Sequence, residues 1–147
     1  FFAITNSSAF FIFSFVLFIY NVDRGGEHNK PNMLINDSNL ILIDHELTFP
    51  FVNDTTQTVD YEFFIGNYQF QKHILIKYLR SLRNKEGIFD DFLEMLKHLN
   101  ISNLSRIFDE MDKFNIPYIE RQKFMHYFAW AKQNAFVLER YLKGMIA

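Results

Sequence analysis

Three polar residues have the types and the spacing that could bind a hard cation. Asn32 comes just before a short apolar run, 33–35, and Asp44 follows a second run, 40–43. The turn cluster between the runs predicts a β-hairpin, and antiparallel pairing brings the two outer ends of a hairpin together. Asp23, in the loop that leads into the hairpin, can approach the same point. Two carboxylates and one amide oxygen suit Mg²⁺, which takes oxygen ligands and keeps positions for water or phosphates.

Taken singly, each of these residues could instead cap a loop or occupy a turn. Their convergence favours a site, because carboxylates gather only where a cation or hydrogen-bond donors offset their repulsion. Other chemistries lack their motifs: His45-Glu46 is not followed by the second histidine of a metalloprotease motif, and the chain has no dinucleotide fingerprint. The sequence therefore predicts a cation site made of oxygen ligands.

The segment from residue 21 to residue 49 also resembles the catalytic segment of protein-kinase-like phosphotransferases, and within them the HipA-like kinase domains. The short form of that family's motif reads N-x-D-R, a loop that ends in N-P-N, two or three aliphatic residues, a turn and then L-I-D-H. This chain carries, in the same order, Asn21-Val22-Asp23-Arg24, Asn29-Lys30-Pro31-Asn32-Met33-Leu34-Ile35 and Leu42-Ile43-Asp44-His45-Glu46. The resemblance is most specific here and continues weakly to the C-terminus.

The resemblance implies a role for each polar residue. Asp23 is similar to the catalytic-loop aspartate that accepts or orients the proton of the substrate hydroxyl, and Asn32 to the asparagine that holds a second Mg²⁺. Asp44 is similar to the aspartate that bridges the metal to the β- and γ-phosphates of ATP. The loop between Asp23 and Asn32 is longer than the usual kinase interval, so Asn29 is a rival to Asn32 as the metal ligand.

Two further residues of the motif are expected to support the site. Arg24 is expected to pair with an acidic neighbour rather than to touch a phosphate oxygen, and His45 directly follows the metal-binding aspartate. The cofactors that the resemblance implies are Mg²⁺ and ATP.

The fold class that we expect is α+β and mostly α-helical: a protein-kinase-like C-terminal lobe with a catalytic loop and one small β-hairpin. Residues 1–147 would form one such lobe, in which 1–52 hold a buried helix, the catalytic loop and the metal-binding hairpin, and 61–147 form a helical scaffold. No glycine-rich loop and no strand with a phosphate-pairing lysine precede the catalytic loop. An N-terminal ATP-binding lobe is therefore expected on an upstream part of the protein, since the chain begins without Met, or on another polypeptide.

Residues 9–20 read AFFIFSFVLFIY, in which only Ser14 and the Tyr20 hydroxyl are polar. A membrane span needs about 20 apolar residues, whereas shorter runs are more typical of a buried helix. A helix that is apolar on all sides must be surrounded by protein. We therefore predict a buried core helix rather than membrane association, with a membrane anchor as the alternative.

Charge and cysteine content limit the partners and the compartment. Lys and Arg together number 15 and Asp and Glu 17, which argues against a dominant nucleic-acid surface. The chain has no cysteine, which excludes disulfides and thiolate zinc sites and fits a cytoplasmic protein.

Helical periodicity predicts helices over 70–82 and 88–99, a short helix capped by Asn100 or Ser102, and a last helix within 119–146. The last helix carries an apolar stripe whose members step by four and three: Phe124, Phe128, Ala131, Ala135, Leu138, Leu142 and Met145. This stripe could be the seam of a homodimer. Flanking apolar residues make it wider than a two-residue seam, which favours packing in the core of the domain.

The function that the sequence predicts is that of a HipA-like kinase, which transfers the γ-phosphoryl group of Mg·ATP to a hydroxyl. The expected acceptor is a Ser or Thr of a protein substrate. The alternative is a non-catalytic, kinase-like helical module that binds a protein partner.

Overall fold

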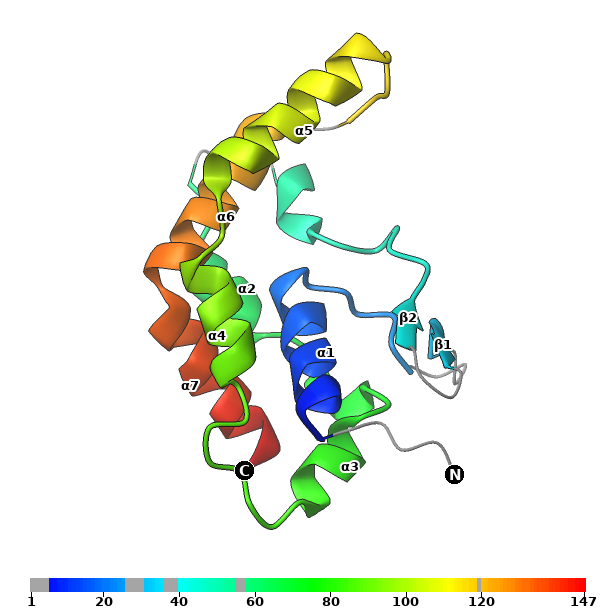
Figure 1. Cartoon of the computed structure of the whole chain (residues 1–147), viewed down its shortest axis with the longest axis vertical. Coiled ribbons are helices and arrows are strands. Elements are labelled where there is room, and N and C mark those ends of the chain that lie inside the picture. The colour runs from blue at the N-terminus through cyan, green and yellow to red at the C-terminus, as the bar shows by residue number, and fades with distance from the viewer. Residues whose placement is uncertain (1–5, 26–30, 36–39, 55–57, 119) are drawn as a thin grey trace.

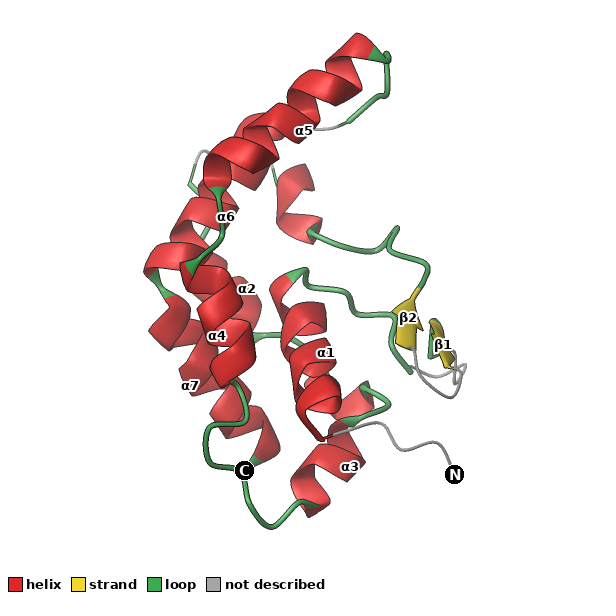
Figure 2. Ribbon diagram, viewed as in Figure 1, coloured by secondary structure: helices red, strands yellow, loops and turns green. Residues whose placement is uncertain are grey.

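The computed structural model describes residues 6–25, 31–35, 40–54, 58–118 and 120–147. Within these residues the chain forms seven α-helices, two short 3₁₀ helices and one two-stranded antiparallel sheet (Figures 1 and 2). The prediction of a mostly helical protein with one small hairpin is therefore confirmed. The α-helices are α1 (Asn6–Phe18), α2 (Tyr61–Gly66), α3 (Ile76–Ser81), α4 (Asp90–Lys97), α5 (Ile101–Lys113), α6 (Arg121–Gln133) and α7 (Ala135–Ile146).

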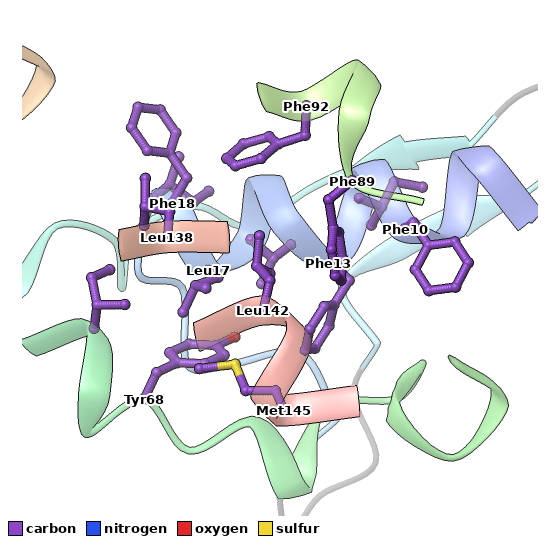
Figure 3. Packing of buried hydrophobic residues seen from close by; sticks show 14 of the residues in the cluster. Phe10, Phe13, Leu17, Phe18, Tyr68, Phe89, Phe92, Leu138, Leu142 and Met145 are labelled. Carbon is purple, nitrogen blue, oxygen red and sulfur yellow. The ribbon is translucent and has the colours of Figure 1, made fainter. Parts of the chain in front are cut away.

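Helix α1 is the buried helix that the sequence predicts. Its only polar side chain in the middle, Ser14, donates to the carbonyl of Phe10 at 2.8 Å and so needs no partner outside the helix. Helix α4 packs against α1, and residues of α4 and α7 join it in the core (Figure 3). Among the described residues, no helix combines the length and the apolar character that a membrane span requires.

The exit of α1 fixes the start of the predicted catalytic loop. Tyr20 adopts a left-handed backbone, with φ of 52°, and the next amide, of Asn21, donates to the carbonyl of Val16 at 3.0 Å. Tyr127 of α6 is fully buried here, stacks on the Phe18 ring at 5.5 Å and donates its hydroxyl to the Phe18 carbonyl. The last turn of α1 is therefore held by packing and by hydrogen bonds at the point where the loop begins.

The prediction of one helix over 70–82 is wrong. Residues Phe70–Lys72 form a 3₁₀ helix, η2, and α3 begins only at Ile76. Between them His73 is extended, with φ of −68° and ψ of 130°, and the amide of Ile74 donates to the carbonyl of Arg24 at 2.8 Å. At this interruption the backbone of the segment is hydrogen-bonded to the loop that follows α1.

The last helix is also divided, which corrects the expectation of a single helix within 119–146. Asn134 separates α6 from α7, and both its backbone amide and its side-chain amide donate to the carbonyl of Trp130 at 2.8 Å. Asn134 itself leaves the helical conformation, with φ of −114° and ψ of 32°, and so ends α6. The apolar stripe still faces inward on both halves, as predicted, with Ala131, Leu138 and Leu142 fully buried.

The hairpin consists of β1 (Met33–Ile35) and β2 (Leu40–Leu42), as the sequence predicts. Met33 pairs with Leu42, Leu34 with Ile41 and Ile35 with Leu40. In Figure 1 the hairpin lies on the side of α1 away from α4 and α7. A second 3₁₀ helix, η1 (Pro50–Asn53), returns the chain to the core through Phe51 and Val52.

Candidate functional site

Asp23 and Asn32, which the sequence places nine residues apart, are in direct contact. The Asn32 side-chain amide donates to the Asp23 carboxylate oxygen Oδ2 and to the Asp23 backbone carbonyl, both at 2.9 Å. Because the two N–H groups of the amide are engaged in this way, Oδ1 of Asn32 is the side-chain atom that remains for a cation.

Strand pairing places Asp44 beside this contact. Beyond the pair formed by Met33 and Leu42, the amide of Ile43 donates to the carbonyl of Asn32 at 3.0 Å. Asp44 is the next residue, and its side chain is exposed. The structure therefore joins Asp23 to Asn32 by a side-chain contact and places the backbone of Asp44 beside Asn32. Asn29, the rival ligand, lies outside the described residues.

Asn32 and Asp44 share an uncommon backbone conformation. Their φ angles are 46° and 59°, in the left-handed region that costs most residues about 1–2 kcal/mol and that asparagine and aspartate enter most readily. Arg24 binds the carbonyl groups of both residues. The carbonyl groups of the two residues therefore point toward the buried guanidinium, which binds them.

Arg24 holds the loop and the hairpin together. Only 2% of its surface is exposed, and its Nη1 donates to the carbonyls of Asn32 and Ile43, at 2.7 Å in the second case. Its Nη2 reaches the carbonyl of Asp44 at 3.5 Å and the ring of His45 at 3.1 Å. The sequence predicts an acidic partner for Arg24, but these hydrogen bonds go to backbone carbonyls and to an imidazole.

The pKa of Arg24 is lowered, because the effect of burial outweighs that of the neighbouring side chains. Burial lowers the pKa of the guanidinium, and the nearby Tyr68, Asp44 and Asp23 side chains raise it in opposition. Since arginine keeps its proton at any physiological pH, the site contains one permanent positive charge next to two acidic side chains.

His45 supports Arg24 from the exposed side. Because a guanidinium only donates hydrogen bonds, Nδ1 of His45 is the acceptor in this contact, and the proton of the neutral ring is on Nε2. Nε2 lies 3.3 Å from the carbonyl of Leu42, to which it can donate. The supporting role predicted for His45 is therefore a contact with Arg24.

Asn21 and Tyr68 belong to the same network, although the sequence does not single them out. Asn21 is fully buried, its Oδ1 accepts from the amide of Asp23 at 2.9 Å, and its Nδ2 lies 3.4 Å from the carbonyl of Asp44. The buried Tyr68 hydroxyl donates to the Asn21 carbonyl at 2.8 Å, and burial raises the pKa of this hydroxyl above its ordinary value. The place of Asn21 in the N-x-D-R motif is the only signal in the sequence for its role. The sequence carries no signal for the role of Tyr68.

Gly25 allows the loop that follows α1 to lie against the segment between η2 and α3. Its φ is 124°, and a Cβ at this position would stand 2.8 Å from the carbonyl oxygen of Lys72 and 3.0 Å from the amide nitrogen of Ile74. Any side chain here would therefore separate the two backbones and strain the residue itself.

We expect Gly25→Ala to lower the free energy of unfolding by about 2 kcal/mol or more, because it adds both strain and a backbone clash. Gly144→Ala is the matched control, since a Cβ at Gly144 meets nothing within 4 Å and alanine favours the helix by up to about 1 kcal/mol. Urea unfolding of the two variants measures both effects. Equal stabilities of the Gly25→Ala protein and the wild type would contradict the close approach described above.

His73 is a buried histidine next to Arg24. Only 4% of its surface is exposed, and its Nδ1 accepts from the amide of Leu75 at 3.1 Å. Its Nε2 has no hydrogen-bond partner in the described part of the chain. Burial, with a smaller contribution from the charge of Arg24, lowers the pKa of His73 to about 4.

This shift predicts a loss of stability in acid. The unfolded chain takes up a proton at His73 near its ordinary pKa of 6.5, while the folded protein does so only near 4. The contribution of His73 to the free energy of unfolding is therefore complete above pH 6.5 and falls by about 3 kcal/mol between pH 6.5 and 4. His73→Asn keeps an acceptor for the Leu75 amide but does not titrate, so its stability should fall less over this interval. Parallel pH profiles of the two proteins in urea unfolding would refute the prediction.

The described residues contain no group of three or more His, Asp or Glu side chains placed to hold a metal ion. The candidate site that the sequence predicts would instead use the carboxylates of Asp23 and Asp44 and the amide oxygen of Asn32. This donor set, made of oxygen alone, fits Mg²⁺, and the left-handed backbone at two of the three positions is the kind of local strain that is common at binding sites. Comparison with protein-family models, with curated proteins and with solved structures finds no match for this chain.

Proposed function

We propose that this chain is the C-terminal catalytic lobe of a HipA-like kinase, which transfers the γ-phosphoryl group of Mg·ATP to a hydroxyl group. The acceptor that we propose is a Ser or Thr of a protein. The observation that carries the proposal is that one buried arginine binds the backbone carbonyls of Asn32 and Asp44, while the side chain of Asn32 contacts that of Asp23.

Each of the three side chains would have its own role in phosphoryl transfer. Asp23 would accept or orient the proton of the attacking hydroxyl, and its hydrogen bond with Asn32 keeps the carboxylate in one orientation. Asn32 and Asp44 would hold magnesium through oxygen atoms. Bound Mg²⁺ supplies charge neutralisation for the phosphates of ATP.

Positioning is the main contribution that such a reaction asks of a protein. The backbone groups of the loop and of the hairpin are tied to Arg24 and Asn21, both of which are buried. The scaffold is therefore rigid where the three side chains project from it. An ATP-binding lobe on the same protein or on another polypeptide is part of the proposal, because phosphoryl transfer also requires a clamp for the nucleotide.

The proposal is tested by calorimetry of Mg·ATP binding and by transfer of labelled phosphate, with the longest protein that the gene encodes. We expect binding that depends on Mg²⁺, and transfer that Asp23→Asn abolishes while nucleotide binding remains. Asparagine retains an oxygen that can accept from Asn32, so the substitution removes the charge and leaves the loop intact. Absence of Mg·ATP binding by the wild type would overturn the kinase proposal and favour the non-catalytic module.

A further inference from the structure

Asn21 connects three parts of the protein through four hydrogen-bonding groups. Its backbone amide donates to Val16 at the end of α1, and its carbonyl accepts from Tyr68 after α2. Its side chain accepts from the amide of Asp23 and lies within hydrogen-bonding distance of the Asp44 carbonyl. All four polar groups of this fully buried residue are thus engaged, as expected for a residue that orders its surroundings.

The two side-chain contacts need an acceptor and a donor on the same short side chain. The oxygen of Asn21 meets an N–H group, that of Asp23, and its nitrogen meets a carbonyl, that of Asp44. Aspartate has no donor when it is ionised, and serine is too short to span both partners while keeping the local turn. Asparagine is therefore the residue that joins the backbone of the loop directly to the backbone at the exit of the hairpin.

We infer that Asn21 is a positioning residue, which sets the separation between the proton-accepting Asp23 and the metal-binding Asp44. The inference rests on the proposed function, because it concerns the geometry of those two side chains. Asn21 is buried and contacts the backbone of both residues, so it acts through them and touches neither substrate nor metal. Residues that orient metal ligands in this way change metal affinity or activity by about 10–100-fold when they are replaced.

The variant that isolates this role is Asn21→Ser. A serine hydroxyl can still accept from the amide two residues later, so the turn to Asp23 is kept and the contact with Asp44 is lost. The probe is Mn²⁺, followed by electron paramagnetic resonance in the presence of an ATP analogue whose β,γ-bridge is not hydrolysed. We expect Asn21→Ser to bind Mn²⁺ about tenfold or more weakly than the wild type.

Tyr127→Phe is the control for a purely structural effect. It removes a fully buried hydroxyl that donates to the carbonyl of Phe18 in α1, and it leaves the contacts of Asn21 with Asp23 and Asp44 in place. We expect it to lower the melting temperature and to leave Mn²⁺ affinity within about threefold of the wild-type value, well below the change expected for a lost positioning residue.

The outcomes separate this inference from the proposed function. If the wild type binds no Mn²⁺, the proposed function fails and the role of Asn21 fails with it. If the wild type binds Mn²⁺, Asp44→Asn weakens that binding and Asn21→Ser does not, the role of Asn21 is wrong and the kinase proposal stands.

A second measurement uses the wild type alone and so does not depend on the folding of a variant. Nuclear magnetic resonance can follow the side-chain amide of Asn21 while Mg²⁺ and the same analogue are added. We expect this resonance to shift, because its amide faces the carbonyl of a metal-binding residue, whereas the side-chain amide of Asn134, between α6 and α7, should not. An unchanged Asn21 resonance on metal binding would also overturn the inference.

Discussion

Asp44→Asn is expected to reduce phosphoryl transfer by about 10²–10³-fold with almost no change in melting temperature, the size of effect seen when one electrostatic group of an active site is removed. The side chain of Asp44 is exposed, and the hydrogen bonds from Asn21 and Arg24 are accepted by its backbone carbonyl. Asparagine also accepts the left-handed backbone at this position, where φ is 59°. The substitution therefore removes the charge and preserves the local fold.

Glu46→Gln provides the matched control for Asp44→Asn. It makes the same change of charge two residues away, on a side chain that is also exposed. Initial rates at saturating Mg·ATP should stay within about threefold of the wild-type rate for this variant, because screening in water makes such distant surface charges weak. Equal losses of rate in the two variants would contradict a specific role of Asp44, because they would show that removing any negative charge from this segment has the same effect.

Arg24→Leu is expected to lower the free energy of unfolding by about 3–5 kcal/mol. The guanidinium is the donor for carbonyl groups of Asn32 and Ile43, and hydrogen bonds to a charged group contribute about 1.5–3 kcal/mol each. Leucine fills part of the volume but leaves these buried carbonyls without that donor. Urea unfolding measures the loss, and calorimetry of Mg·ATP on the folded fraction should show that nucleotide binding is lost as well.

Two other arginine variants make this prediction specific. Arg24→Lys keeps the positive charge but replaces a planar group with several donors by a single ammonium, so we expect an intermediate loss of stability. Arg106→Leu replaces an exposed arginine of α5 whose hydrogen bond to Asn103 is 3.4 Å long, and should change stability by less than about 0.5 kcal/mol. Similar losses for Arg24→Leu and Arg106→Leu would contradict the role of Arg24 as the link between loop and hairpin.

Local patterns in the sequence are sufficient for the elements that carry the candidate site. Two short aliphatic runs separated by turn residues predict the hairpin, in which Met33 pairs with Leu42. The apolar run of residues 9–20 predicts a buried helix, and α1 is that helix. These features are accessible because each depends on residues that are neighbours in the chain.

The interruptions of the helices could not be predicted from periodicity. The segment 73–75 has an apolar pattern typical of a helix, but its backbone binds Arg24, some 50 residues earlier in the chain. Asn134 is tolerated inside many helices, yet here its backbone leaves the helical conformation and ends α6. Helix propensity differs by less than about 1 kcal/mol among most residues, so it predicts neither break.

The sequence alone determines which residue types are available to the candidate site, and it predicts that Asn32 and Asp44 flank the hairpin. Only the tertiary structure decides how they are held: by a buried arginine that binds carbonyl groups rather than a carboxylate, and by Asn21, whose contacts reach from α1 to Asp44. The physical reason is that burial and hydrogen bonds between distant segments set the partners of a polar group. Patterns of neighbouring residues do not contain that information.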